Sequence, residues 1–437
     1  MTPPDRSADA GSSDPFPRLR GRPPGPRARA LVARDRQVVS PASPRAYPLV
    51  VERGEGACVW DVDGNRYLDF TSGVAVNALG HAHPEIVRVV AEQSRRFLHM
   101  AGPDFYYEVM VEFAEKLCAL APGKGPKKVF LTNSGTEAVE AALKLARHAT
   151  RRPFLIAFYG GFHGRSLGSL SLTASKAIQR RHFGPLLPGI FHAPYGDLDF
   201  IERHLFRQVA PPEDVAAIFV EAIQGEGGYH VAPRGFLEGL RALCDRHGIL
   251  LAADEIQSGL GRTGRWWAVD HWGVIPDILC VSKPAGGGLP LGAMISRADL
   301  QTWPPGSHSN TFGGNPLACA AGLRTLEIIQ EQKLLENARR MGAYLRRRLR
   351  ELHRRHPRLG APRGLGLMQA ADILRPRNGR PDAEARDRIL RAAFERGLLL
   401  LGCGEAALRF LPPLIIRRVH VDAAIEILDQ VLRKERP

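Results

Sequence analysis

Several patterns that would place this chain in a simple class are missing from its sequence. The six cysteines are scattered, with no Cys-x-x-Cys pair and no metal-ligand spacing, which excludes a disulfide framework and a zinc module. No apolar run approaches the roughly 20 residues of a membrane span, and the N-terminus lacks a hydrophobic signal core. Aromatic residues make up only 7%, yet the hydrophobic content of 44% is ordinary for a globular protein. We therefore expect a cytoplasmic globular protein with no metal site and no membrane partner.

Acidic residues are also in short supply relative to basic ones. The chain has 60 Lys and Arg against 45 Asp and Glu, a net charge of +15. Such a balance raises nucleic acid as a possible partner, which makes a nucleic-acid-binding protein the alternative from another class. The basic residues are spread through predicted helices, however, and their densest runs are residues 346–350 and 353–356. A solvated helix surface explains them better, so we expect no nucleic-acid partner.

The order of apolar segments predicts the domain organisation. Residues 1–25 are rich in Pro, Arg, Ser and Asp and are expected to form a flexible leader, followed by an N-terminal segment, 26–100, that contributes to a small domain. Residues 101–320 are expected to form a large domain and 321–437 a smaller α/β domain. Within the large domain, predicted strands alternate with helices, which indicates a mainly parallel, doubly wound sheet. The predicted strands are 128–132, 154–158, 215–220, 249–253 and 278–281, with a further strand at 292–296 and a long helical stretch at 316–352.

Two of these strands end in a charged residue. The apolar run 250–253 stops at Asp254, and the run 277–282 stops at Lys283. Ligands of open α/β sheets bind beyond the carboxyl ends of the strands, so an acid and an amine there suggest a cofactor site. Lys283 would be a Schiff-base nucleophile and Asp254 the partner of a ring nitrogen. The alternative is an ion pair between the two, although the glycines at 286–288 leave space for a ligand.

Two loops carry weaker signals. Ser134 with Glu137 predicts a capping box, and Gly135 lets a phosphate approach the helix N-terminus, although a plain helix cap has the same sequence. The glycine-rich segment 158–165 is expected to present Phe162 to a planar group. It also carries Arg165, whose guanidinium is suited to bind a carboxylate. A glycine-rich loop around a core aromatic remains the alternative.

Seven sequence blocks, in family order, resemble the class III aminotransferases. These are pyridoxal-phosphate enzymes of fold type I, the aspartate-aminotransferase-like fold, and the resemblance runs from about residue 24 to the C-terminus, nearest to the prokaryotic and archaeal 4-aminobutyrate aminotransferase-like branch. The blocks are 67–70 (YLDF), 80–84 (GHAHP), 134–137 (SGTE), 221–228 (EAIQGEGG), 254–264 (DEIQSGLGRTG) with the lysine at 283, 311–316 (TFGGNP) and 409–413 (RFLPP).

The resemblance implies a cofactor, pyridoxal 5'-phosphate, and the residues that bind it. Lys283 would hold it covalently and move the substrate proton, and Asp254 would keep its ring nitrogen protonated. A homodimer or higher homo-oligomer with a shared active site is implied, because Thr311 would reach the phosphate of the other subunit. The remaining implied cofactor contacts are Ser134, Gly135, Thr136, Phe162, His163 and Gln257.

The resemblance also implies a substrate class. Arg165 matches an arginine that holds a distal carboxylate, Arg409 one that takes the α-carboxylate of glutamate or 2-oxoglutarate, and Glu226 the acid that masks Arg409. These residues favour a ping-pong ω-aminotransferase acting on 4-aminobutyrate, with 2-oxoglutarate as acceptor. The aliphatic Val74 disfavours ornithine modestly. Acetylornithine or succinylornithine, ornithine or lysine transamination, and amino-acid racemisation, remain alternatives. Pro284, Ala285 and Ala222 depart from the family pattern and bear on substrate fit.

Overall fold

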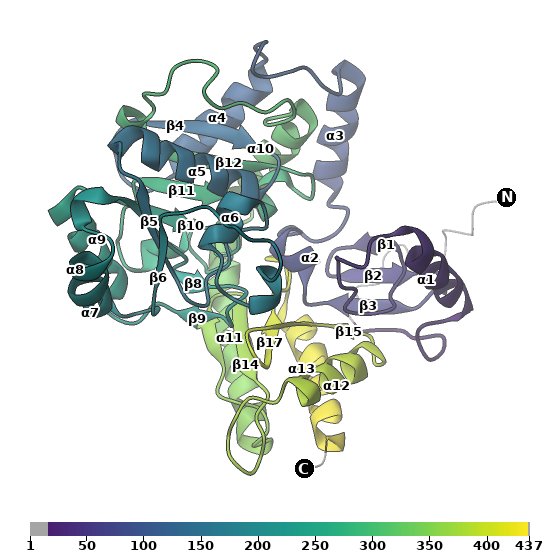
Figure 1. The fold of residues 1–437 in the computed structure, drawn as a ribbon. Coiled ribbons are helices and arrows are strands. Elements are labelled where there is room, and N and C mark those ends of the chain that lie inside the picture. The colour runs from purple at the N-terminus through teal and green to yellow at the C-terminus, as the bar shows by residue number, and fades with distance from the viewer. Residues whose placement is uncertain (1–15, 436–437) are drawn as a thin grey trace.

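A seven-stranded sheet forms the centre of the computed structural model, which describes residues 16–435 (Figure 1). The strand order is β4-β12-β11-β10-β7-β5-β6, and β12 alone runs antiparallel to its neighbours. The expected mainly parallel α/β sheet is therefore confirmed, and the further strand at 292–296 is the antiparallel β12. The strands are β4 (Lys127–Thr132), β5 (Phe154–Phe158), β6 (Ile190–Ala193), β7 (Val215–Val220), β10 (Leu250–Asp254), β11 (Ile278–Val281) and β12 (Gly292–Arg297).

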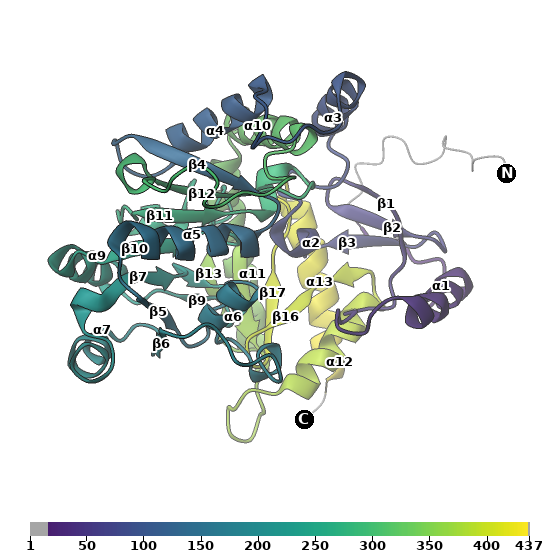
Figure 2. The same cartoon turned by 45° about the horizontal axis from the view of Figure 1, so that its top comes forward.

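Both faces of this sheet are buried, which explains why its strands read as continuous apolar runs. Along β10, Leu250 and Ala252 face one core and Leu251 and Ala253 face the other, because successive side chains point to opposite faces. Helix α5 (Gly135–Thr150) covers the first face (Figure 2). The second face is covered by α4 (Glu108–Leu120), α9 (Phe236–His247) and α10 (Pro316–Glu331).

The C-terminal part builds a second, four-stranded sheet in the order β13-β14-β17-β16. Its strands are β13 (Arg363–Leu365), β14 (Met368–Asp372), β16 (Leu401–Cys403) and β17 (Ala407–Phe410). Helices α11 (Leu334–Arg355), α12 (Ala383–Phe394) and α13 (Arg418–Lys434) pack around its core. The helical stretch predicted at 316–352 is thus two helices, α10 and α11. It breaks at Lys333, whose φ of +53° lies in the left-handed region and cannot continue an α-helix.

The N-terminal segment forms a third sheet in the order β1-β2-β3-β15. Strand β15 (Leu398–Leu399) comes from the C-terminal part and pairs in parallel with β3 (Arg66–Asp69), so the two ends of the chain share one sheet. The predicted leader lies partly outside the described residues, which begin at 16; within them, Arg18 forms a β-bridge with Arg66. The other elements here are α1 (Pro26–Val38), β1 (Val51–Glu55), β2 (Cys58–Asp61), α2 (Ser72–Ala75) and α3 (Pro84–Arg96).

The densest basic run lies on α11 and is partly engaged within the chain. Arg355 pairs with Asp429 of α13 at 2.9 Å, Arg348 pairs with Asp422, and Arg346 donates to the carbonyl of Gly364 at 2.8 Å. Helices α11 and α13 are therefore joined by charge as well as by their apolar faces. Between residues 16 and 435, no helix combines the length and the apolar character needed to cross a bilayer.

Candidate active site

The carboxyl ends of the central strands gather the charged residues of the site. Asp254 is the last residue of β10 and Lys283 follows β11, and these two strands are parallel neighbours in the sheet. A third acid, Glu221, follows β7 on the other side of β10. All three side chains line one cavity of about 370 Å³, within the usual range for a small-molecule site of about 300–1,000 Å³. The lining residues are Ser134, Gly135, Thr136, Phe162, His163, Gly164, Arg165, Glu221, Glu226, Asp254, Ile256, Gln257, Ser282 and Lys283.

Asp254 is held by groups other than Lys283. His163 Nδ1 lies 2.8 Å from one carboxylate oxygen, and the backbone N–H of Ile256 donates to the other at 3.0 Å. Burial opposes a charge on His163, but the contact with Asp254 outweighs it and raises the pKa of the imidazole. Asp254 is only 5% exposed, so this contact compensates much of the cost of burying a carboxylate.

Lys283 is placed to react rather than to pair. Among the described residues it makes no ion pair with Asp254, so the alternative interpretation of a simple ion pair is wrong. Burial lowers the pKa of its amine, although the charges of Asp254 and Glu221 act in the opposite direction. A lowered pKa increases the fraction of neutral amine, which is the nucleophilic form. Its φ of +47° also marks a strained backbone at the strand end.

The N-terminus of α5 forms one wall of the cavity. Ser134 caps the helix by accepting from Glu137 N at 3.4 Å, but Glu137 accepts from Asn133 N at 2.7 Å, so the predicted capping box is only half formed. A Cβ on Gly135 would lie 2.8 Å from Ile256 Cδ1, so only glycine fits here without displacing the cavity wall. The hydroxyl of Thr136 is engaged by Ser166 and Ser169, both at 2.6 Å. The anion-binding groups left at this end are the backbone N–H groups.

The glycine-rich loop after β5 brings Phe162 and Arg165 to the opening of the cavity. Phe162 N donates to Glu221 at 2.9 Å, and the Arg165 guanidinium lies 5.8 Å from the centre of the Phe162 ring. Arg165 is exposed toward the opening. On the inner side, Gln257 has a buried Oε1 atom with no hydrogen-bond partner in the described chain. A buried polar atom that lines a cavity and has no partner indicates a missing ligand.

A chain of three charged side chains lies on the side of the smaller domain. Glu226 accepts from Arg409 Nη1 at 3.1 Å through one oxygen and from Lys176 Nζ at 2.6 Å through the other. Arg409 projects from β17 and is 8% exposed. Glu226 therefore pairs with Arg409, whose guanidinium is predicted from the family resemblance to bind a substrate carboxylate.

Two predicted site residues lie outside the cavity lining. Thr311 is exposed near the end of the loop that leads into α10, and it does not line the cavity of Lys283. Val74 lies in α2 with a φ of +62° and also lines no part of this cavity. Their expected roles, with Thr311 acting from a second subunit, stay predictions.

Sequence reasoning missed two residues of the site. Glu221 follows an apolar strand in the same way as Asp254, and that pattern would have identified it. Its carboxylate accepts from Phe162 N and from Gly225 N at 2.8 Å, and burial raises its pKa to about 7. Lys176 carries no such signal, because it lies 50 residues from Glu226 in a loop.

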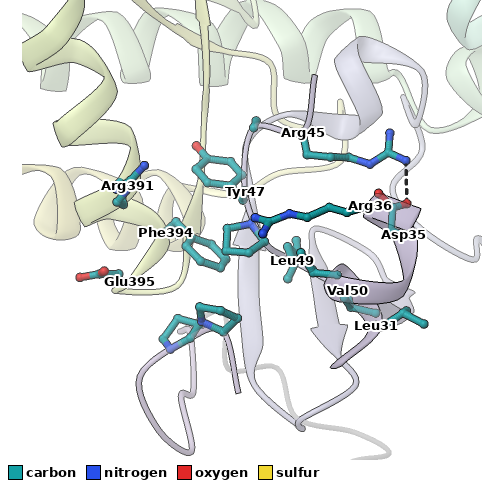
Figure 3. A pocket seen from close by; sticks show the side chains of 15 residues that line it. Leu31, Asp35, Arg36, Arg45, Tyr47, Leu49, Val50, Arg391, Phe394 and Glu395 are labelled. Carbon is teal, nitrogen blue, oxygen red and sulfur yellow. Dashed lines mark hydrogen bonds and ion pairs between the residues drawn. The ribbon is translucent and has the colours of Figure 1, made fainter. Parts of the chain in front are cut away.

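A larger cavity of about 600 Å³ lies elsewhere, between α1, residues 45–50 and the end of α12 (Figure 3). Its floor is apolar, with the rings of Tyr47 and Phe394 stacked 5.0 Å apart. Charged residues also line it, and Arg45 pairs there with Asp35 at 3.0 Å. None of the predicted site residues lines it. The smaller cavity is therefore the candidate active site.

Comparison with known proteins agrees with this geometry. The family model for class-III aminotransferases matches residues 39–432. The chain is 37% identical to an alanine/serine racemase from Pyrococcus horikoshii (96% of this chain, 93% of that one). It is 39% identical to a 5-aminovalerate aminotransferase from Pseudomonas aeruginosa (91% and 97%), and 43% identical to an acetylornithine aminotransferase from Methanopyrus kandleri (89% and 95%). The ornithine aminotransferase structure from Toxoplasma gondii superposes with a TM-score of 0.86 at 33% identity, covering 94% and 96% of the two chains.

The chain belongs to the class-III aminotransferases, which are pyridoxal-phosphate enzymes of fold type I. The residues present fit that cofactor. The glycine at the start of α5 leaves room for a phosphate, Gln257 offers a buried polar atom without a partner, and Asp254 supplies a carboxylate for a ring nitrogen. The protein is thus a pyridoxal-phosphate-dependent aminotransferase, which exchanges an amino group between a donor and a 2-oxo acid.

Proposed function

We propose that the protein transfers the amino group of an ω-amino acid, with 4-aminobutyrate as the first candidate, to 2-oxoglutarate by a ping-pong mechanism. The observation that carries this proposal is the 3.1 Å contact between Glu226 and Arg409, made at the cavity that Arg165 also lines. Arg165 is available to bind a distal carboxylate, while Arg409 is masked by Glu226. That arrangement suits an amine with no carboxylate next to it.

On the cofactor side, each proposed role follows from a contact. Bound pyridoxal phosphate supplies the electron sink that lets the carbon bearing the amino group lose a proton. Lys283 would accept and return that proton at Nζ, which its lowered pKa favours. Asp254, fixed by His163, would keep a negative charge beside the ring nitrogen, and Phe162 would cover the ring face. The first N–H groups of α5, after Ser134, would hold the phosphate.

On the substrate side, two arginines would bind substrate carboxylates in different half-reactions. Arg165 would bind the distal carboxylate of the ω-amino acid in the first half-reaction, while Glu226 keeps Arg409 neutralised. In the second half-reaction Glu226 would turn away, toward Lys176 alone, and Arg409 would bind the α-carboxylate of 2-oxoglutarate. One cavity could thus accept two substrates that differ at the carbon that reacts.

We also propose that the active unit is a homodimer in the cytoplasm. The exposed position of Thr311, away from the cavity of its own chain, supports a contribution to the phosphate site of a second subunit. The six scattered cysteines, with no Cys-x-x-Cys pair among them, support a reducing compartment. A monomeric mass in solution with full activity would contradict the shared site. Thr311→Ala is expected to weaken cofactor binding without changing that mass.

Two other functions are favoured by particular relatives. The acetylornithine aminotransferase of Methanopyrus kandleri supports N-acetylornithine as donor, and the alanine/serine racemase of Pyrococcus horikoshii supports racemisation. N-acetylornithine reacts through its terminal amine, whose carbon carries no carboxylate, so a masked Arg409 suits it as it suits 4-aminobutyrate. Racemisation of alanine or serine, by contrast, places a carboxylate next to the reacting amine and needs Arg409 unmasked. The resting contact between Glu226 and Arg409 therefore favours a terminal amine over the racemase substrates, and the choice between 4-aminobutyrate and N-acetylornithine falls to the half-reactions.

Half-reactions with single substrates test the proposal. The holoenzyme is mixed with 4-aminobutyrate, 5-aminovalerate, N-acetylornithine, ornithine, lysine or alanine, and the change in the cofactor absorbance gives kcat/KM for each. We expect the highest value with an ω-amino acid, and a fall of about a hundredfold in Arg165→Ala with that donor, because a charged hydrogen-bond partner is lost. A higher value with N-acetylornithine would overturn the assignment. Loss of enantiomeric purity of alanine without a 2-oxo acid would identify a racemase.

A further inference from the structure

Tyr229 is an unusual residue on the substrate side of the site. It is completely buried, and its hydroxyl has no hydrogen-bond partner among the described residues. Its φ of +60° lies in the left-handed region, which is strained for a bulky side chain. A buried tyrosine normally satisfies its hydroxyl. Strain together with an unused polar group indicates that this side chain serves a ligand or a second conformation.

The turn that carries Tyr229 also carries Glu226, and it is anchored to the sheet of Arg409. Gly404, in the turn between β16 and β17, donates from its N to the Glu226 carbonyl at 2.8 Å. Arg363 Nε of β13 donates to the carbonyl of Gly228 at 2.7 Å. The position of Tyr229 relative to β17 is therefore set by hydrogen bonds to the backbone of its turn on two sides.

The Tyr229 side chain packs on the face of the sheet from which Arg409 projects. It belongs to a buried cluster that includes Ala370 and Ala407. Ala370 is the register partner of Arg409, and Ala407 is two residues before it in β17, so both point to the same face as Arg409. Arg409 meanwhile has a buried Nε atom with no partner among residues 16–435. The Tyr229 hydroxyl, an acceptor without a donor, and Arg409 Nε, a donor without an acceptor, therefore lie on the same face of the sheet.

A second buried cation strengthens this arrangement. Arg262 is 1% exposed, and it uses Nη1 for the carbonyls of Leu367 and Pro412 while Nε and Nη2 have no partner. Burial raises the pKa of Tyr229 well above its usual value, against the charges of Arg409 and Arg262, so the hydroxyl stays neutral. Among the described residues, Glu226 is the acid paired with Arg409, and this half-buried side chain is held by Lys176 through its other oxygen.

We propose that Tyr229 is a specificity-determining positioning residue, whose hydroxyl oxygen accepts a hydrogen bond from the Arg409 guanidinium when Glu226 releases it. Arg409 would then keep its orientation for the α-carboxylate of an α-amino acid or a 2-oxo acid. Without the hydroxyl, the unmasked guanidinium would have fewer fixed contacts and would bind that carboxylate less well. The inference rests on the proposed alternation between masked and unmasked Arg409, and it adds the group that stabilises the unmasked state.

Tyr229→Phe tests this, because it removes one oxygen and keeps the ring. The matched control is Tyr67→Phe in β3, which removes a buried hydroxyl that donates to Asp61 at 2.9 Å and does not line the cavity. Two quantities are measured on the holoenzymes. The first is kcat/KM for the half-reactions with glutamate and with 4-aminobutyrate. The second is the dissociation constant of glutarate, an unreactive dicarboxylate, by titration calorimetry.

We expect Tyr229→Phe to lower kcat/KM with glutamate about tenfold, mainly through KM, and to weaken glutarate about as much, since a hydrogen bond to a charged group is lost. The 4-aminobutyrate half-reaction should stay within about twofold, because Arg409 is masked there. Tyr67→Phe should change neither ratio. Equal losses with both amines, or unchanged glutarate binding, would overturn the role of Tyr229. If wild type reacts with glutamate but with no ω-amino acid, the proposed donor is wrong, while the glutamate and glutarate comparison still decides on Tyr229.

Discussion

His163 Nδ1 lies 2.8 Å from an oxygen of Asp254, although the two residues are 91 positions apart in the chain. The histidine comes from the loop after β5 and the carboxylate from the end of β10. Strand β7 lies between these two strands, so the contact closes the back of the cavity across three strands. Asp254 is thereby fixed in one orientation, which a group that must match a ring nitrogen requires.

Replacing His163 should therefore impair the cofactor site without removing any group that contacts substrate. In His163→Phe, Asp254 loses a charged hydrogen bond, which is worth about 1.5–3 kcal/mol. We expect kcat to fall about ten- to a hundredfold, with weaker cofactor binding. Steady-state kinetics and cofactor titration measure both quantities. The control is His192→Phe. His192 is partly buried and its ring bonds the carbonyl of Leu172, which does not line the cavity, so this variant should keep its activity.

Gly135 should be essential for cofactor affinity because of the space around it. An alanine Cβ would lie 2.8 Å from Ile256 Cδ1, so either the cavity wall or the start of α5 must shift. Since the phosphate would rest on those first N–H groups, we expect Gly135→Ala to weaken cofactor binding about tenfold or more. Equilibrium titration of the apoenzyme measures it. Gly125→Ala, where a Cβ meets nothing within 4 Å, should bind the cofactor like wild type; equal affinity of both variants would contradict a phosphate site here.

Lys176 should tune the balance between the two substrates. It holds one oxygen of Glu226 at 2.6 Å while Arg409 holds the other. Lys176 is 36% exposed, so its contact contributes modestly. We expect Lys176→Met to change the ratio of kcat/KM between 4-aminobutyrate and glutamate about two- to fivefold, because Glu226 loses its alternative partner. Lys116→Met, whose amine contacts Gln330 on the surface, should leave the ratio unchanged. An unchanged ratio in Lys176→Met would show that Lys176 does not affect the pairing between Glu226 and Arg409.

Glu255 should make the fold less stable as the pH rises. It is 1% exposed, and burial raises its pKa to about 7 from a usual value of 4.5. The folded chain therefore binds this proton more tightly than the unfolded chain. The contribution to stability is complete below about pH 4.5 and is lost as the pH rises through about 7.

Glu255→Gln isolates this effect because glutamine does not titrate. We expect the free energy of unfolding of the wild type to fall relative to the variant by on the order of 2–3 kcal/mol between about pH 5 and pH 8. Denaturant titrations at several pH values measure it. Glu238→Gln, at an exposed position of α9, should show the same pH dependence of the free energy of unfolding as the wild type. Parallel curves for Glu255→Gln would show that this carboxyl titrates normally in the folded protein.

Local patterns were enough to predict most of the large domain. The runs 154–158, 215–220 and 278–281 are strands with those same bounds, because a strand buried on both faces must be apolar along its whole length. The edge strand β6 was missed, since its first three residues are only partly buried and carry no such signal. The break between α10 and α11 was missed because both sides of Lys333 favour helix, and the packing of the two helices decides the turn.

The sequence by itself determined the family and the residues at the strand ends, Asp254 and Lys283, because the end of an apolar run is visible in one dimension. It could not show that the two avoid pairing with one another. That was decided by His163, which the tertiary structure brings from another strand. In the same way, only the packing of the Gly225–Tyr229 turn against β16 and β17 places Tyr229 beside the face of Arg409 and Lys176 beside Glu226. Such contacts depend on distance in space, and separations of 50 to 183 residues in the chain leave no local trace of them.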